Sequence, residues 1–99
     1  VVFVLIDSVS ASATEMAIDA LSTVKNVTLI GEKTSGEVLS QSPFDTSEGF
    51  QAFIPVGDYY SFSNGRIEGI GIKPDVEVKK SDALKIAKKL ARKAIAVGK

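Results

Sequence analysis

Residues 1–31 decide the fold that we expect, and they read VVFVLIDSVSASATEMAIDALSTVKNVTLIG. The apolar, β-rich run Val1–Ile6 is typical of a central parallel strand that is covered on both faces. Small polar residues follow it, then apolar residues at helical spacing from Ala13, then a second apolar run at Val27–Ile30. A strand, a loop, a helix and a strand in this order form a βαβ unit. We therefore predict an α/β fold built of such units.

The first helix should bury one apolar stripe and end at Lys25-Asn26, where a cation and a good C-cap residue follow each other. Asp19 falls off this stripe. The members of the stripe are small or branched apolar residues at helical spacing: Ala13, Ala17, Ala20, Leu21 and Val24.

The middle of the chain is expected to be mostly extended. Glu32–Ser42 is polar and predicts a loop, whereas Phe50–Val56 and Tyr59–Phe62 are β-prone. Asn64-Gly65 favours a tight turn. The segment Gly69–Val78 contains a proline, which disfavours a helix there.

Residues 81–97 predict an amphipathic helix. This helix lies in a strongly basic segment, since residues 79–99 carry eight basic residues and one acidic residue. The basic side chains lie opposite the apolar stripe, so a solvated helix face is favoured over binding of nucleic acid or lipid. The stripe consists of Ala83, Ile86, Ala87, Leu90, Ala94 and Val97, and the basic face of Lys85, Lys88, Lys89, Arg92 and Lys93.

The composition argues against several kinds of catalytic and metal-binding site. The 99 residues contain no cysteine and no histidine, which excludes disulfides, thiol catalysis and cysteine-ligated zinc within them. The commonest general base is missing as well. No carboxylate spacing suggests a metal, and GxGxxG and Walker-type loops are absent, so we expect no metal and no cofactor.

The candidate site is the hexapeptide SASATE, Ser10–Glu15, between the first strand and the first helix. A hydroxyl here would lie at the carboxyl end of a sheet, where open α/β folds bind ligands. The free N–H groups of the helix N-terminus would suit an oxyanion hole. The same residues also form a capping box, with Ser12 as N-cap and Glu15 reaching back. On the hexapeptide alone the cap is the favoured interpretation.

Further motifs follow SASATE in order: VTLIGEKTSG at 27–36, Gln41, YY at 59–60 with NGRIEG at 64–69, and GIKPD at 71–75. Together they resemble the motifs of the C-terminal processing (tail-specific) serine peptidases over residues 1–80. The resemblance implies a ClpP/crotonase-like fold and hydrolysis of peptide bonds through an acyl-enzyme. It also implies Ser12 as the nucleophile and a peptide or protein as the substrate. In this hypothesis the Ala13 N–H, at the helix N-terminus, contributes to the oxyanion hole.

The chain departs from that pattern at the general base. In the tail-specific branch a lysine follows the glycine of the GExTxG loop, and here that residue is Glu37. The tricorn-core-like branch instead pairs the serine with an upstream histidine, which an acidic residue orients. For that orienting role the candidate is Glu68, followed by Glu15 and Glu37. Two alternatives remain open: a non-catalytic peptide- or ligand-binding relative, and a crotonase-type acyl-CoA enzyme, which SASATE disfavours.

We expect residues 1–99 to form a single domain, with a family-like core at 1–80 and the amphipathic helix at 81–97. Because Val1 already lies in a predicted core strand, we expect an incomplete fragment, the C-terminal part of a catalytic core. The base would then lie outside this chain, and the isolated fragment would be inactive. Exposed strand edges favour self-association. Export to the periplasm or cell envelope is a further expectation, from the resemblance alone.

Overall fold

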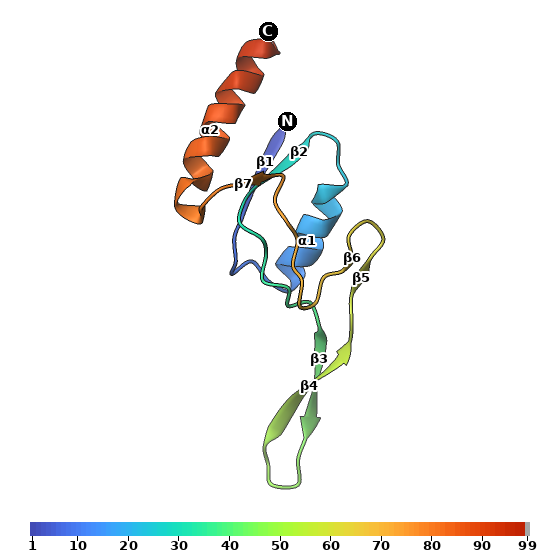
Figure 1. The fold of residues 1–99 in the computed structure, drawn as a ribbon. Helices are drawn as coiled ribbons and strands as arrows, with labels where there is room; N and C mark the ends of the chain where they lie inside the picture. Colours follow the sequence, from blue (N-terminus) through green and yellow to red (C-terminus); the bar gives the residue numbers. More distant parts are fainter. Residues whose placement is uncertain (99) are drawn as a thin grey trace.

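The structure, a computed structural model, describes residues 1–98, and it is mixed helix and strand, as predicted. It is elongated, with extents of 65 × 28 × 19 Å (Figure 1). None of the described helices is both long enough and apolar enough to span a membrane. In chain order the elements are β1 (Val2–Ile6), α1 (Ala13–Ser22), β2 (Val27–Gly31), β3 (Ser40–Asp45), β4 (Gln51–Gly57), β5 (Tyr60–Ser61), β6 (Gly65–Arg66), β7 (Val76–Glu77) and α2 (Lys80–Val97).

The core sheet has the strand order β1-β2-β7, with both pairs parallel. Val4 lies opposite Leu29 and Ile6 opposite Gly31, so β1, α1 and β2 form the predicted βαβ unit. The prediction of a central first strand is wrong for the described residues, in which β1 pairs with β2 alone and β2 is the inner strand. Leu5 of β1 is 44% exposed. A continuous apolar run therefore indicates a tendency toward burial and does not fix the place of the strand in the sheet.

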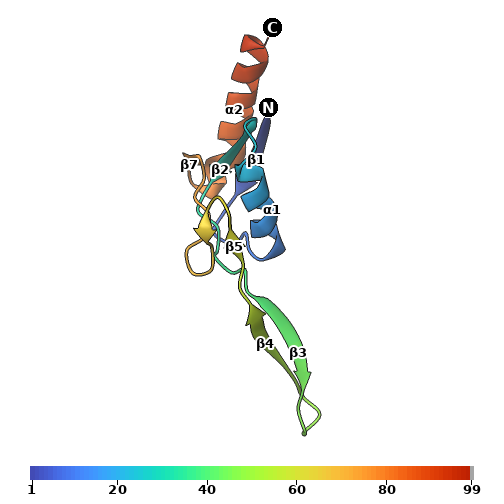
Figure 2. The ribbon, with the colours of Figure 1, turned by 90° about the vertical axis from the view of Figure 1, so that its right-hand side faces the viewer.

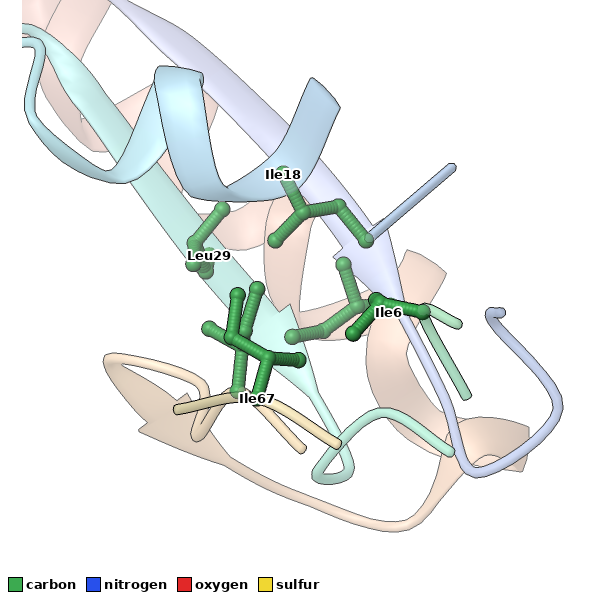
Figure 3. Close-up of a cluster of buried hydrophobic side chains, with 6 residues drawn as sticks. Ile6, Ile18, Leu29 and Ile67 are labelled. Atoms are coloured by element: carbon green, nitrogen blue, oxygen red, sulfur yellow. The ribbon is translucent and has the colours of Figure 1, made fainter. Parts of the chain in front are cut away.

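Helix α1 covers one face of the sheet. Its Ile18 packs with Ile6 and Leu29 of the strands and with Ile67 from the later loop, as Figure 3 shows. These side chains are at most 3% exposed, so this cluster excludes water from beneath α1. The carboxyl ends of β1 and β2 are thereby fixed against the helix.

Helix α2 covers the opposite face. Ile30 of β2 points to this side because neighbouring residues of a strand alternate between faces, and it is fully buried against Ala83 and Ala87. The predicted amphipathic stripe is confirmed through Ala94, whereas Val97 is exposed. The five predicted basic residues of the helix all lie on its exposed side, in agreement with the prediction.

The predicted apolar stripe of α1 is wrong. The helix buries Glu15, Ile18 and Asp19, whereas the alanines of the predicted stripe are exposed. Two carboxylates replace apolar residues on the inner face because loop N–H and hydroxyl groups bond to them. The buried face therefore serves hydrogen bonding as much as packing.

The end of α1 also differs from the prediction. The helix stops at Ser22, with Thr23 as C-cap, before the expected Lys25-Asn26. Both hydroxyls bond backward to carbonyl oxygens of the last turn, Ser22 to that of Asp19 at 2.7 Å and Thr23 to that of Ala20 at 2.8 Å. Such local bonds compete with continued helix and end it early.

Strands β3 and β4 form an antiparallel hairpin that projects away from the sheet and from α2 (Figures 1 and 2). Strand β4 agrees with the prediction, but β3 begins inside the segment predicted as a polar loop, Glu32–Ser42. The pairing of Ser42 with Ile54 and of Phe44 with Ala52 overrides the polar composition of β3. The hairpin starts where the candidate site lies.

Candidate active site

Ser12 lies between β1 and α1, as the sequence predicts, and its backbone is strained. It is the single non-glycine residue among 1–98 with positive φ, at φ 60° and ψ −130°. A conformation of this kind costs about 1–3 kcal/mol in a residue with a side chain. Ser12 is exposed and lines a cavity of about 720 Å³. A strained serine on a sharp strand-to-helix turn is the arrangement that presents a nucleophile to a cleft.

The predicted capping box is present, and its two halves differ in their hydrogen bonds. The Glu15 carboxylate accepts the Ser12 N–H at 3.1 Å, which is one half. Ser12 and Glu15 occupy the positions of the other half, but the Ser12 hydroxyl makes no capping hydrogen bond. The Glu15 N–H bonds to the Ser12 carbonyl oxygen instead, at 2.8 Å. Ser12 is therefore an N-cap whose hydroxyl is not used as a cap.

The Ala13 N–H is the first of the helix. Among residues 1–98 it has no hydrogen-bond acceptor, whereas the N–H groups of Thr14 and Glu15 bond to carbonyl oxygens of Ala11 and Ser12. Free N–H groups at a helix start carry positive partial charge. This donor belongs to the residue that directly follows Ser12 in the sequence.

The Glu15 carboxylate is fully buried and joins α1 to the loop after β2. Its Oε1 accepts the Thr34 hydroxyl and the Gly36 N–H, each at 2.7 Å. Its Oε2 accepts the Glu37 N–H at 2.9 Å and the Ser12 N–H at 3.1 Å. Four donors thus satisfy a carboxylate that has no cationic partner within residues 1–98.

The loop after β2 lies between the Ser12 turn and residues 67–72 and is hydrogen-bonded to both. The Ser12 N–H donates to the Glu37 carbonyl at 2.8 Å, and the Gly69 N–H donates to the Gly36 carbonyl at 2.8 Å. Gly36 has φ 80°, and a Cβ there would lie 2.9 Å from the Gly71 nitrogen. Only glycine permits this approach of two backbones without displacement.

Glu68 lines the same cavity as Ser12. One of its carboxylate oxygens accepts the Val38 N–H at 2.6 Å and the Leu39 N–H at 3.2 Å. These bonds fix the cavity wall that leads into β3. Glu68 and Ser12 therefore line one cavity, and the role expected for Glu68, orienting a histidine, stays a prediction.

The charged side chains around the cavity are acidic. Glu37 and Glu68 line it, with no lysine or arginine among the described lining residues. Glu37 is exposed, and Gln41 lies on the same wall. Glu15, the other acidic candidate, does not line the cavity. No group of three or more metal-ligating side chains occurs among residues 1–98.

A second buried carboxylate, Asp19, was missed by sequence reasoning. It accepts hydrogen bonds from Ser61 at 2.5 Å, Asn64 at 2.6 Å and Tyr59 at 2.7 Å. Burial pushes the pKa of Asp19 upward, but these bonds outweigh it and hold the pKa below its ordinary value. The bond to Asp19 raises the pKa of Tyr59. The spacing of Glu15 and Asp19 by four residues was the available signal, since it places both on one helix face.

Curated relatives match most of this chain but little of their own length. The carboxyl-terminal-processing protease of Synechocystis sp. is 39% identical over 72 residues, which cover 73% of this chain and 17% of the relative. The chloroplastic carboxyl-terminal-processing peptidase 1 of Arabidopsis thaliana is 33% identical over 72 residues, 73% of this chain and 15% of the relative. The chain therefore spans less than a fifth of the length of these relatives.

Solved structures and a family model agree with the relatives. A photosystem II D1 C-terminal processing protease superposes with a TM-score of 0.69 at 33% identity, covering 79% of this chain and 20% of the other. A Bacteroides fragilis protein assigned to the S41 proteases gives 0.68 at 26% identity, covering 91% and 27%. Residues 1–78 match the sequence model of Peptidase family S41. The chain belongs to Peptidase family S41.

Proposed function

We propose that the full-length protein is a serine-type endopeptidase and that Ser12 is its nucleophile. The observation that carries the proposal is the backbone of Ser12, at φ 60°, with the residue exposed beside a cavity of about 720 Å³. A cap alone does not require positive φ, because N-cap residues normally adopt β-region angles. The retained strain favours a functional role for the turn.

In the proposed reaction the Ser12 Oγ attacks the carbonyl carbon of the scissile peptide bond while a general base takes its proton. The carbonyl oxygen becomes an oxyanion, and the free Ala13 N–H is positioned to donate to it. The C–N bond then breaks, and the amine leaves with the proton held by the base. Water hydrolyses the resulting ester and regenerates the Ser12 hydroxyl.

The general base in this proposal comes from outside residues 1–98, because Glu37 occupies the position of the lysine and the chain has no histidine. Glu68 would orient an incoming histidine from the cavity wall. One of its carboxylate oxygens already holds the Val38 and Leu39 N–H groups, and the other has no hydrogen bond within the described chain. The isolated chain should accordingly be inactive.

The wider setting is proposed from the relatives. Several are carboxyl-terminal-processing peptidases, which supports peptide or protein substrates, and some are chloroplastic, which is in keeping with an exported protein. We propose a ClpP/crotonase-like core that continues outside this chain. Residues 1–99 would form a single domain, the C-terminal part of that core, and the free edge of β1 would allow association with further strands.

The test uses the full-length protein and a fluorophosphonate probe, which reacts with activated serines. We expect covalent labelling, located at Ser12 by peptide mass spectrometry, and its loss in Ser12→Ala. Glu68→Gln should slow labelling without abolishing it, because the nucleophile and the Ala13 N–H remain. Labelling that persists in Ser12→Ala would end the assignment.

A second candidate is a non-catalytic peptide-binding relative, and Glu37 in place of the expected lysine favours it. This candidate predicts no fluorophosphonate labelling of the full-length protein. It also predicts binding of unfolded polypeptide, measured by fluorescence anisotropy, that is weakened by bulky substitutions on the cavity wall, such as Ser40→Trp. Labelling of Ser12 would exclude it.

A further inference from the structure

We propose that Glu15 is the positioning residue of this site, rather than a partner of the general base. Its buried carboxylate holds the Ser12 turn and the loop after β2 in one rigid unit. The proposal rests on the proposed function, because positioning matters only if Ser12 reacts. It concerns a residue that touches neither substrate nor the reacting atoms.

The Glu15 carboxylate accepts hydrogen bonds from two segments, the Ser12 turn and the loop after β2. Oε2 bridges the Ser12 N–H at 3.1 Å and the Glu37 N–H at 2.9 Å. The Ser12 N–H in turn donates to the Glu37 carbonyl at 2.8 Å, so the two residues are tied directly and through Oε2. This closed set of bonds fixes the peptide plane before Ser12, and with it the positive φ.

The second carboxylate oxygen extends the set to the far side of the loop. Oε1 accepts from Thr34 and Gly36, and the Thr34 hydroxyl also accepts the Ile72 N–H at 2.7 Å. Glu15 is thus connected through one hydroxyl to the 67–72 segment, which contains Glu68. A single side chain links the nucleophile turn, the residue at the lysine position and the segment of the proposed orienting carboxylate.

Only a carboxylate can fill this place. All four partners are donors, and an amide would offer one acceptor oxygen and place an NH₂ against N–H groups. Burial of a carboxylate without a cation is unfavourable unless its oxygens are satisfied. The ion pair of the described chain is Arg66 with Asp58, far along the sequence, so within residues 1–98 no cation compensates Glu15.

The burial of Glu15 argues against its other candidate role, which is to orient the histidine that would act as general base. It is 0% exposed and does not line the cavity, whereas Glu68 does. With each oxygen already accepting two hydrogen bonds, Glu15 has no free acceptor to orient a histidine from outside the chain. Its effect on reactivity must therefore act through the Ser12 backbone.

The experiment compares Glu15→Gln with Asp19→Asn in the full-length protein. Asp19 is the matched control, because it is a buried carboxylate one turn later on α1 whose donors lie at 59–64, away from Ser12. We expect Glu15→Gln to slow fluorophosphonate labelling of Ser12 by about 10- to 100-fold, the range that a small misplacement of reacting groups produces. Asp19→Asn should slow it far less, because the donors to Asp19 lie at 59–64 and none of them belongs to the Ser12 turn.

A readout that does not need activity separates this inference from the proposed function. Hydrogen exchange at the Gly36 and Glu37 amides should accelerate in Glu15→Gln and stay slow in Asp19→Asn. If wild-type Ser12 is not labelled, the proposed function has failed and the exchange result alone decides whether Glu15 fixes the loop. Equal slowing of labelling by both variants, or unchanged labelling in folded Glu15→Gln, would overturn the positioning role.

If Glu15→Gln does not fold, Thr34 carries the test. Thr34→Val removes the hydroxyl that donates to Oε1 at nearly constant volume, whereas Thr34→Ser keeps it. We expect slower labelling in Thr34→Val and near wild-type labelling in Thr34→Ser. Equal rates in the two variants would contradict the proposal.

Discussion

Gly71 lies so close to Thr34 that a Cβ on Gly71 would be 2.3 Å from the Thr34 carbonyl oxygen. No Cβ fits at that distance, so the two backbones can meet only through a glycine. The contact joins the 67–72 segment to the loop after β2, and Gly36 makes a reciprocal approach to the Gly71 nitrogen. The geometry around Ser12 therefore depends on a glycine that is distant from it in the sequence.

Gly71→Ala is expected to lower the free energy of unfolding by about 3 kcal/mol or more. Positive φ costs a residue with a Cβ about 1–2 kcal/mol, and displacement of the Thr34 backbone adds to it. Urea denaturation of the full-length protein measures the change. The matched control is Gly49→Ala, since Gly49 shares φ 80° but a Cβ added there would have nothing within 4 Å. Similar losses in both variants would show that the contact with Thr34 is unimportant.

Leu29→Ala should destabilise the protein by about 2–5 kcal/mol. Leu29 is 1% exposed on the inner strand, and its truncation leaves a cavity under α1 that the packed neighbours fill poorly. Leu84→Ala removes the same atoms from α2, where Leu84 is 55% exposed, and should cost less than about 1 kcal/mol. Denaturant midpoints give both values. A larger loss for Leu84→Ala would indicate that α2 is buried by another part of the protein.

Hydrophobic patterning was a good guide to β1 and β2, whose apolar runs form the sheet, and to α2, whose apolar stripe packs against that sheet. It failed for α1 because most donors to the buried carboxylates of Glu15 and Asp19 lie 19 to 45 residues later in the sequence. Propensity gives no information about such distant partners. The same limit applies to β3, whose extended form depends on pairing with β4 rather than on its own polar residues.

The nucleophile candidate was accessible from sequence because SASATE lies at a strand-to-helix junction and resembles a family motif. The positive φ of Ser12 was not accessible, since it arises from bonds to Glu37 and Glu15 that only the folded loop provides. The same holds for the Ser12 hydroxyl, which makes no capping hydrogen bond although the capping-box pattern is present. Sequence thus indicated the position of the candidate site but not its strain.

The Asp19 cluster predicts acid sensitivity. The pKa of Asp19 is lowered in the folded protein, so its stabilising effect is present above the ordinary aspartate pKa and is lost as pH falls through the folded pKa. The pKa of Tyr59 is raised, so its effect is present below the ordinary tyrosine pKa and is lost as pH rises through the folded value. The difference in stability between wild type and Asp19→Asn should therefore shrink below about pH 4.

Thermal unfolding of both proteins from about pH 2.5 to about pH 7, a range that spans the ordinary aspartate pKa, measures that difference. Tyr59→Phe is a useful control because it removes one of three donors to Asp19 and should shift the acid transition only partly. A stability difference that does not vary with pH would show that Asp19 is held in its uncharged form or is not bonded as described.

The strain at Ser12 predicts an inverted order of two small substitutions. Ser12→Gly and Ser12→Ala both remove the hydroxyl and should both abolish fluorophosphonate labelling. At φ 60°, however, glycine is unstrained, whereas alanine keeps the Cβ and its penalty. The glycine variant should therefore be the more stable of the two by about 1 kcal/mol, although glycine normally lowers stability through its freedom in the unfolded chain. Parallel urea titrations of the two variants measure the order. An alanine variant as stable as the glycine variant would mean that residue 12 does not adopt the strained conformation, and the main support for Ser12 as the nucleophile would be lost.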